Sequence, residues 1–465
     1  RALIERGVDV TAVMPLYGQI DREKHGIKPA KEIGKTVVKM GDEEERIAFW
    51  RTAPGGEAAP VYFVENESCF GREGIYNDPD SGEGFADNAK RFILFQKAVI
   101  HFLKKRAGKA DVVHCNDHQT GLLPYYIKRD PALKKVASLF SIHNLAYQGV
   151  ELPELLPLAD IPKEKFMPMS PFEFWGKINM MKIGIHFADV LSTVSPTYAK
   201  EIRSSGEFGY GLEGVLQNRR RDLFGIINGI DTDVWNPETD ELIPHNFNAN
   251  DLKGKGANKR ELLNYLGLPV SNKRVPLIGM VGRLVDQKGL DILAKALDDI
   301  LALDVQMVVL GTGQQRYHKM LEDAAKRYPK KLAVRLAFDN ALAHFIEAGS
   351  DMFLMPSRYE PCGLNQLYSL RYGTVPIVRA TGGLADTVRA FDSEKKTGTG
   401  FHIKKYSSEA LIRAVRKAIS TYNNSEDWLQ LVKNGMGKDF SWEGSAIEYI
   451  DIYKLATSKR NSTGE

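Results

Sequence analysis

Short apolar runs that end in polar or glycine residues recur along this chain, and helical spacing follows them. Six runs lie in the first half of the sequence and six in the second. They cover residues 8–15, 61–66, 110–117, 137–144, 189–195, 223–231, 275–284, 305–313, 332–337, 351–357, 375–381 and 398–403. Continuous rather than alternating apolar runs are typical of strands buried on both faces, as in parallel sheets covered by helices. The pattern therefore predicts an α/β fold.

The strand–helix units fall into two successive sets, which predict two doubly wound, Rossmann-like domains. A segment rich in proline, lysine and glycine, residues 232–274, separates the sets. We assign residues 1–236 to the first domain and 237–440 to the second. Residues 441–465 are expected to form a C-terminal helix that packs back on the first domain.

The composition of the chain excludes some classes of partner but does not indicate a function. Among the 465 residues, 63 basic and 59 acidic side chains leave a net charge of only +4. The basic run of Arg219, Arg220 and Arg221 is therefore expected to be a solvated surface, and no nucleic-acid partner is predicted. No apolar stretch approaches the roughly 18 to 20 residues of a membrane span, so no membrane partner is predicted either.

The number and spacing of the cysteines indicate the redox environment of the protein. Cys69, Cys115 and Cys362 are far apart, odd in number and form no CxxC pair. This usage favours a reducing environment without a disulfide framework.

Polar residues end two neighbouring strands of the first domain. Asp117 and His118 follow one strand, and His143 and Asn144 follow the next. These groups could hold the hydroxyls of a sugar; alternatively, Asp117 and Asn144 only cap the helices that follow. No metal site is expected, because the histidines, including His114, do not have the spacing of a ligand motif.

The last strand of the first domain ends in Asn228-Gly229, followed by Ile230 and Asp231. Asn-Gly is a strong turn signal, so a tight exit toward the linker explains this stretch as well as a role in a site does.

In the second domain, the first strand leads to a glycine-containing turn with Arg283 and Lys288, five residues apart. An arginine fork, a lysine charge and a helix start suit a diphosphate. The alternative is a pair of solvated loop charges. A second turn, Thr381-Gly382-Gly383, also opens a helix and suits phosphate.

Between these turns, another strand leads to Glu360, Cys362 and Gly363 just before a helix. The bracketing Pro361 and Gly363 would aim the carboxylate of Glu360 toward the strand ends. There is no G-x-G-x-x-G strand-to-helix turn, Walker A motif or G-x-S-x-G elbow in the sequence, which disfavours nicotinamide dehydrogenases, P-loop proteins and hydrolases.

Six segments along nearly the whole chain resemble, in order, the motifs of the glycogen and starch synthases of glycosyltransferase family 5. They are HCNDHQTGLLP, SIHNLAYQG, INGIDTDVWNP, GRLVDQKGLD, SRYEPCGLNQLYSLRYGTVPIV and TGGLADTV. The resemblance implies a GT-B fold, with two Rossmann-like domains facing a deep interdomain cleft. It also implies an enzyme that moves glucose from ADP-glucose to the non-reducing end of an α-1,4-glucan.

The resemblance also implies roles for individual residues. Arg283 and Lys288 match diphosphate-binding cations, and Thr381, Gly382 and Gly383 match a second phosphate-contacting turn. Glu360 matches the acidic residue at the donor sugar, with Cys362 and Gly363 beside it. Asp117, His143 and Asn228 match first-domain residues that line the reacting glucose, and Tyr76 matches more loosely an aromatic near the cleft.

Retention of configuration is implied, by front-face attack in which the leaving ADP accepts the proton of the acceptor. No metal and no cofactor are expected, because Arg283 and Lys288 can offset the charge on the diphosphate. Members of the family are found in the bacterial cytoplasm or in plastids. The sequence does not decide between ADP-glucose and UDP-glucose as donor, and it does not give the preferred acceptor length or the oligomeric state.

One family feature, a first strand followed by a K-x-G-G-L loop, does not occur in the sequence. We therefore expect the sequence to be incomplete by roughly 20–30 residues of an opening βαβ unit, and the first sheet to lack a central strand. A catalytically impaired glucan-binding fragment, or a related GT-B enzyme using another nucleotide sugar, are the alternatives. The presence of Arg283, Lys288 and Glu360 favours an enzyme over a pure binder.

Overall fold

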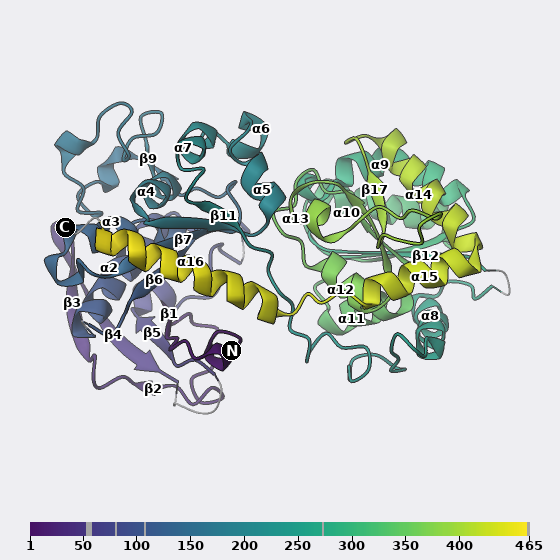
Figure 1. Ribbon diagram of the computed structural model, residues 1–465, viewed down its shortest axis with the longest axis horizontal. Coiled ribbons are helices and arrows are strands. Elements are labelled where there is room, and N and C mark those ends of the chain that lie inside the picture. The colour runs from purple at the N-terminus through teal and green to yellow at the C-terminus, as the bar shows by residue number, and fades with distance from the viewer. Residues whose placement is uncertain (53–57, 80, 107, 272–273, 463–465) are drawn as a thin grey trace. The chain divides into compact units, whose positions relative to one another are not determined.

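The computed structural model describes residues 1–52, 58–79, 81–106, 108–271 and 274–462. The chain folds into two compact units (Figure 1). Unit 1 comprises Arg1–Thr193, Ala199–Ile226 and Ser445–Glu465, and unit 2 comprises Val194–Tyr198 and Ile227–Gly444. The boundary expected after residue 236 lies within unit 2, as do the described residues of 232–274. Residues 463–465 of the expected C-terminal helix lie outside the described part of the chain.

Unit 1 contains eleven strands in its described residues. They are β1 (Ala12–Pro15), β2 (Lys28–Pro29), β3 (Lys35–Met40), β4 (Glu43–Arg51), β5 (Val61–Glu65), β6 (Val112–Asn116), β7 (Ala137–Ile142), β8 (Val150–Glu151), β9 (Ile178–Asn179), β10 (Val190–Thr193) and β11 (Leu223–Gly225). Its helices are α1 (Glu67–Phe70), α2 (Asn88–Lys105), α3 (Leu123–Arg129), α4 (Met180–Phe187), α6 (Gly206–Gly209), α7 (Glu213–Asn218) and most of α16 (Trp442–Ser462), while α5 (Pro196–Glu201) spans a crossing between the units.

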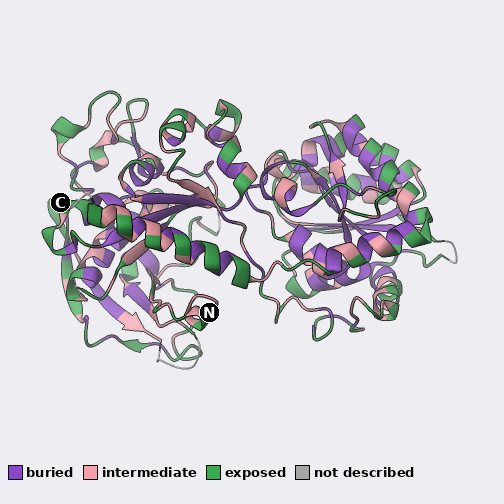
Figure 2. Ribbon diagram, in the orientation of Figure 1, coloured by how far each residue is buried: buried purple, intermediate pink, exposed green. Residues whose placement is uncertain are grey.

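Unit 2 has one parallel six-stranded sheet in the order β14-β13-β12-β15-β16-β17. Its strands are β12 (Leu277–Val281), β13 (Gln306–Leu310), β14 (Leu332–Arg335), β15 (Met352–Met355), β16 (Val375–Arg379) and β17 (Phe401–Ile403). Its helices are α8 (Lys253–Leu266), α9 (Leu290–Ala302), α10 (Gln315–Arg327), α11 (Asn340–Gly349), α12 (Asn365–Arg371), α13 (Gly382–Thr387), α14 (Ser408–Asn423) and α15 (Ser425–Met436). Figure 2 shows the central strands as buried, which matches the continuous apolar runs that predict them.

Each of the twelve apolar runs contains a strand, so the predicted α/β pattern is confirmed. Unit 1 differs from a single sheet, however. Its strands form one sheet in the order β1-β5-β4-β2, with β3 on β4, and a second in the order β11-β10-β7-β6. Within the described residues, β1 pairs only with β5 and β6 only with β7. The expectation that the first sheet lacks a central strand stays a prediction.

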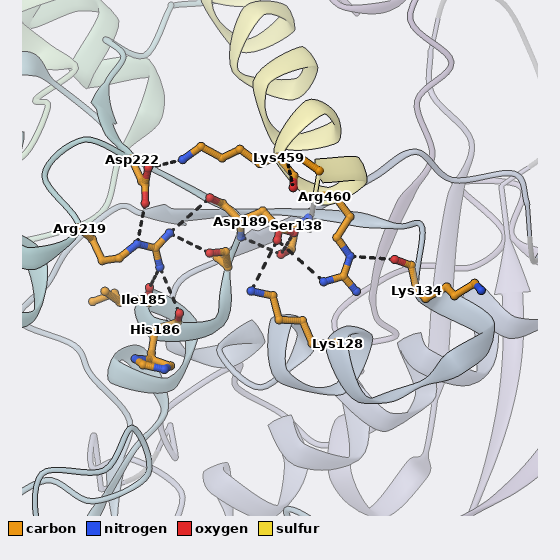
Figure 3. A network of polar contacts seen from close by, with 12 residues as sticks. Lys128, Lys134, Ser138, Ile185, His186, Asp189, Arg219, Asp222, Lys459 and Arg460 are labelled. Carbon is orange, nitrogen blue, oxygen red and sulfur yellow. Dashed lines mark hydrogen bonds and ion pairs between the residues drawn. The ribbon is translucent and has the colours of Figure 1, made fainter. Parts of the chain in front are cut away.

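The basic run expected to be solvated is partly structural. Arg219 donates hydrogen bonds to the carbonyl oxygens of Ile185, at 2.6 Å, and Ala188, at 2.9 Å, and pairs with Asp222 at 2.9 Å (Figure 3). Asp222 also pairs with Lys459 of α16. Arg219 thus joins the end of α4 to the segment on which α16 packs, so the expectation of a solvated surface is wrong for this residue.

The ring of His114 on β6 faces α16. The Nδ1 atom of His114 lies 2.9 Å from the Tyr453 hydroxyl, and the ring centroids of His114 and Tyr449 lie 5.4 Å apart. Desolvation lowers the pKa of His114 to about 3 from its ordinary value of 6.5. His114 is therefore neutral at physiological pH, and it stabilises the packing of α16 in that form.

This burial predicts a pH dependence of stability. Between pH 6.5 and about 3, unfolded His114 binds a proton and folded His114 does not, so the free energy of unfolding falls as the pH falls. Each pH unit in this window costs about 1.4 kcal/mol. Urea unfolding at pH 7.5 and 5.5 should show a smaller loss for His114→Gln than for the unaltered protein. Exposed His25 provides the control, and equal losses in His114→Gln and His25→Gln would contradict the account.

Candidate active site

The carboxyl edge of the unit 2 sheet brings three predicted segments together. The turn η6 (Asp286–Lys288) follows β12 and ends at Gly289, whose φ is 77°. A Cβ at Gly289 would lie 2.1 Å from the carbonyl oxygen of Pro356, just after β15. Only glycine permits this close approach of backbones. The loop after β12 is thereby held against the loop after β15.

This packing places Lys288 against Glu360. The Nζ of Lys288 lies 2.7 Å from Oε2 of Glu360, which also accepts a hydrogen bond of 3.0 Å from the Ser357 hydroxyl. Glu360 is only 5% exposed. A carboxylate so buried needs a partner, and Lys288 supplies it. The two residues predicted for diphosphate and donor sugar are thus direct neighbours.

The Thr381-Gly382-Gly383 turn packs on the loop that carries Glu360. Gly382 has φ 45°, and a Cβ there would lie 2.0 Å from the carbonyl oxygen of Glu360. The N–H of Gly383 donates to that same oxygen at 3.1 Å. Buried Thr381 is the N-cap position of α13. The turn thus opens α13, and its backbone is tied to the loop that carries Glu360.

Replacing Gly383 by alanine is expected to destabilise unit 2 by about 3 kcal/mol. The added Cβ would lie 2.0 Å from the carbonyl oxygen of Cys362, and a backbone atom cannot move aside as a flexible side chain can. Thermal unfolding followed by circular dichroism measures the effect. The control is Gly256→Ala in α8, where the Cβ has only an ordinary contact at 3.9 Å. Equal melting temperatures for the two variants would contradict the packing described.

Cys362 and Asn228 lie side by side in unit 2. Burial raises the pKa of the Cys362 thiol to about 12, and a hydrogen bond from the backbone of Asn228 opposes this shift. Cys362 is therefore an unreactive thiol that packs the loop. The structure places Asn228 in unit 2, whereas Asp117 and His143 lie in unit 1. Gly363, with φ 70°, completes the loop before α12.

Arg283 is exposed, and its Nη2 donates to Oε1 of Gln287 at 3.1 Å. It precedes the turn that carries Lys288. The structure therefore places a second cation on the same loop as Lys288, as the sequence predicts.

Phe338 is a residue that sequence reasoning did not single out. It follows β14 at the carboxyl edge of the unit 2 sheet and is 91% exposed. A phenylalanine so exposed has a face available for stacking on a planar ligand. Its position directly after an apolar run was the available signal, but an aromatic side chain in a loop does not by itself indicate exposure.

In unit 1, Asp117 organises the ends of β6 and β7. Its backbone has φ 55°, and its Oδ1 accepts the N–H of His143 at 2.8 Å. The Nε2 of His143 lies 2.9 Å from Oδ1 of Asn116. Asp117 makes no side-chain cap to the turn that follows it, so the simple helix-capping interpretation is wrong for this residue.

The electrostatics of this cluster favour a ligand that binds by hydrogen bonds. Burial raises the pKa of Asp117, against the charge of His143 and two backbone N–H groups. Burial lowers the pKa of His118, and burial together with Asp117 raises the pKa of half-exposed Tyr76. Asp117, His143 and Tyr76 are thus brought together, with His118 as an added neighbour. Among the described residues, no group of three or more His, Cys, Asp or Glu could hold a metal ion.

Two Rossmann-like units in one chain define the GT-B class of glycosyltransferases. Residues 269–434 match the family of glycosyl transferases group 1. A sucrose-phosphate synthase from Thermosynechococcus elongatus shares the fold, with a TM-score of 0.56 at 15% identity over 98% of this chain and 91% of that one. The predicted fold class is therefore confirmed.

Proteins with higher sequence identity to this chain identify its family within the GT-B class. Residues 1–218 match the starch synthase catalytic domain. The chain is 45% identical to a glycogen synthase of Fervidobacterium nodosum and 44% identical to one of Thermotoga maritima, over 98% of this chain and 93% of each relative. It is 32% identical to the catalytic domain of starch synthase IV from Arabidopsis thaliana bound to ADP and acarbose, with a TM-score of 0.86 over 98% of this chain and 94% of that one.

The chain belongs to the starch synthase catalytic domain family, and it is an enzyme of the glycogen and starch synthase type. The resemblance seen in its motifs is thereby confirmed. Within the described chain, no helix combines the length and apolarity that a membrane crossing requires.

Proposed function

We propose that this protein transfers glucose from ADP-glucose to the non-reducing end of an α-1,4-glucan with retention of configuration. The observation that carries the proposal is the pairing of half-buried Lys288 with buried Glu360 at the carboxyl edge of the unit 2 sheet, 2.7 Å apart. Ligands of such sheets bind outside the carboxyl ends of the strands. Support comes from relatives named glycogen synthase and from the starch synthase IV structure, which was bound to ADP and acarbose.

The donor is held on unit 2. Lys288 and Arg283 offset the charge of the diphosphate, and the Thr381-Gly382-Gly383 turn packs against the loop of Glu360 beside them. The exposed ring of Phe338 stacks on the nucleobase. Glu360 accepts hydrogen bonds from hydroxyls of the donor glucose. Thr381 and the loop of Cys362 and Gly363 set the position of these groups.

Residues of unit 1 bind the reacting glucose. Asp117 and His143, tied together by a 2.8 Å hydrogen bond, present oxygen and nitrogen atoms to its hydroxyls. Tyr76 adds an aromatic face beside them. Because the cluster relies on hydrogen bonds and a half-exposed ring, it suits a neutral sugar better than a charged group.

The reaction breaks the bond between the anomeric carbon and the diphosphate oxygen. It forms a bond from the same face to the 4-hydroxyl oxygen of the acceptor, whose proton passes to the departing diphosphate. Lys288 and Arg283 stabilise the charge that grows on that leaving group, a term that is often the largest in catalysis. The proposal requires neither a metal nor a cofactor. Three buried, unpaired cysteines suit a reducing compartment such as the cytoplasm or a plastid.

The test supplies glycogen with either ADP-glucose or UDP-glucose and follows nucleotide release together with glucose incorporation. Matched release and incorporation with ADP-glucose supports the proposal. Release without incorporation indicates a hydrolase, and preference for UDP-glucose contradicts the assigned donor. Phe338→Ala should raise KM for the donor with less effect on KM for glycogen, whereas exposed Tyr265→Ala in α8 should change neither.

A further inference from the structure

A group of exposed apolar side chains lies in unit 1 beside the Asp117 cluster. A cavity of about 480 Å³ opens there, and its lining includes His118, Tyr147 and Tyr210. Tyr147 is 50% exposed, and Trp175, from a neighbouring turn, is 82% exposed. Large exposed aromatic side chains gathered in one place mark an interaction surface.

The backbone at Trp175 gives a reason to assign it a role. Phe174 and Lys177 exchange two hydrogen bonds, of 2.7 and 3.0 Å, across the two-residue turn Trp175-Gly176. Both turn residues have positive φ, 55° and 78°. Such a turn favours Asn-Gly, and tryptophan is among the residues least suited to its first position. Neither the turn nor burial explains this side chain, so binding is the remaining explanation.

The same feature recurs at Tyr210, which lines the cavity, and at Asp117, which directly precedes the lining residue His118. The described chain contains six non-glycine residues with left-handed backbone, and four of them are Asp117, Met169, Trp175 and Tyr210. Met169 is 93% exposed and Tyr210 38%. Strained residues of this kind persist where the surrounding structure holds them for a function.

Hydrogen bonds and contacts hold these side chains in one continuous arrangement. The Glu173 carboxylate accepts the N–H of Gly176 at 2.6 Å and that of Met169 at 3.4 Å. A Cβ at Gly211, next to Tyr210, would lie 3.6 Å from Nε1 of Trp175.

The arrangement continues to the Asp117 cluster. Gln148 donates to the carbonyl oxygen of Tyr210 at 3.3 Å, and His118 Nδ1 lies 3.1 Å from that of Tyr147. His118 directly follows Asp117 in the chain. These hydrogen bonds and contacts thus connect Trp175, Tyr210 and Tyr147 to the cluster that binds the reacting glucose.

The chemistry of the cavity selects a neutral partner. None of its lining residues carries a fixed charge, and burial lowers the pKa of His118, which keeps its imidazole neutral. Aromatic faces next to backbone and amide groups suit a pyranose chain, which presents apolar C–H faces and hydroxyls in alternation.

We propose that Tyr147, Tyr210 and Trp175 form a platform on which the sugar units of an α-1,4-glucan acceptor stack beyond the reacting end. The platform gives the enzyme its preference for long acceptors. The assignment rests on the proposed function, since it extends the acceptor site of that reaction.

The test compares maltose with maltoheptaose in two assays on the whole 465-residue chain: calorimetric binding, and transfer from ADP-glucose. Trp175→Gly removes the ring and relieves the left-handed backbone, so folding is preserved. It should weaken maltoheptaose binding about tenfold and raise the ratio of KM for maltoheptaose to KM for maltose by a similar factor. Trp175→Phe should keep most of the affinity.

The control is Tyr265→Ala, which alters an exposed tyrosine on α8 of unit 2 and should change neither assay. Unaltered maltoheptaose binding in both Trp175→Gly and Tyr210→Gly would overturn the platform. If the unaltered protein transfers no glucose, yet Trp175→Gly still weakens maltoheptaose binding, the proposed function fails and the platform stands as a glucan-binding surface.

Discussion

Lys288→Ala is expected to lower kcat for glucose transfer by about a thousandfold, the upper range for losing one group that stabilises charge in a transition state. Lys288 is the cation on Glu360, at 2.7 Å, and belongs to the turn that the diphosphate would contact. The substitution removes positive charge where the leaving group becomes negative. It also leaves a carboxylate that is 5% exposed, with the Ser357 hydroxyl as its remaining side-chain partner among the described residues.

Two further variants separate these effects. Lys288→Ala combined with Glu360→Gln removes the unpaired buried charge, so it should recover stability without recovering activity. Lys326→Ala on α10, a surface ion-pair lysine whose side chain is 77% exposed, should leave kcat unchanged. Steady-state kinetics with ADP-glucose and glycogen measure all three. If kcat of the Lys288→Ala enzyme stays within tenfold of that of the unaltered enzyme, the role proposed for Lys288 is contradicted.

Asp117→Asn is expected to lower kcat/KM by about a hundredfold while the protein stays folded. Asparagine tolerates the left-handed backbone at φ 55°, and its Oδ1 can still accept the N–H of His143. Only the negative charge is lost. Asp117→Ala should lower both activity and stability, because alanine does not tolerate the left-handed backbone and has no side-chain oxygen to accept the N–H of His143.

The pH profile gives an independent readout of Asp117. Burial raises its pKa above the ordinary value of 3.8, and the charged form is the stronger hydrogen-bond acceptor. Activity should therefore fall as the pH falls through the raised pKa, and Asp117→Asn should lack that acid limb. An unchanged acid limb in Asp117→Asn would assign the limb to another group.

The strands of unit 2 were predictable because a parallel sheet covered by helices leaves each strand apolar on both faces. The β3–β4 hairpin of unit 1 was not predicted for the opposite reason. β3 alternates more and less exposed residues and carries Lys35 and Lys39, and β4 begins with three successive glutamates, Glu43–Glu45, before a buried run of only three residues, 47–49. A search for continuous apolar runs passes over such strands.

The members of the candidate site were predictable from motifs, but their contacts were not. Lys288 and Glu360 are 72 positions apart, and only the close packing at Gly289 brings their loops together. Trp175 was missed because nothing in the sequence FEFWGK shows that Trp-Gly occupies a turn with positive φ at both positions. The role of Arg219 was hidden because a run of arginines looks the same whether it is solvated or bound to backbone carbonyls.

The central claim is that glucose passes from ADP-glucose to a glucan end with its configuration retained. The most direct measurement follows ADP-glucose labelled with ¹³C at the anomeric carbon by NMR, with glycogen as acceptor. The account predicts that the label appears in a new α-1,4 linkage at the rate of ADP release. Label in a β-linkage, or in free glucose, would contradict it.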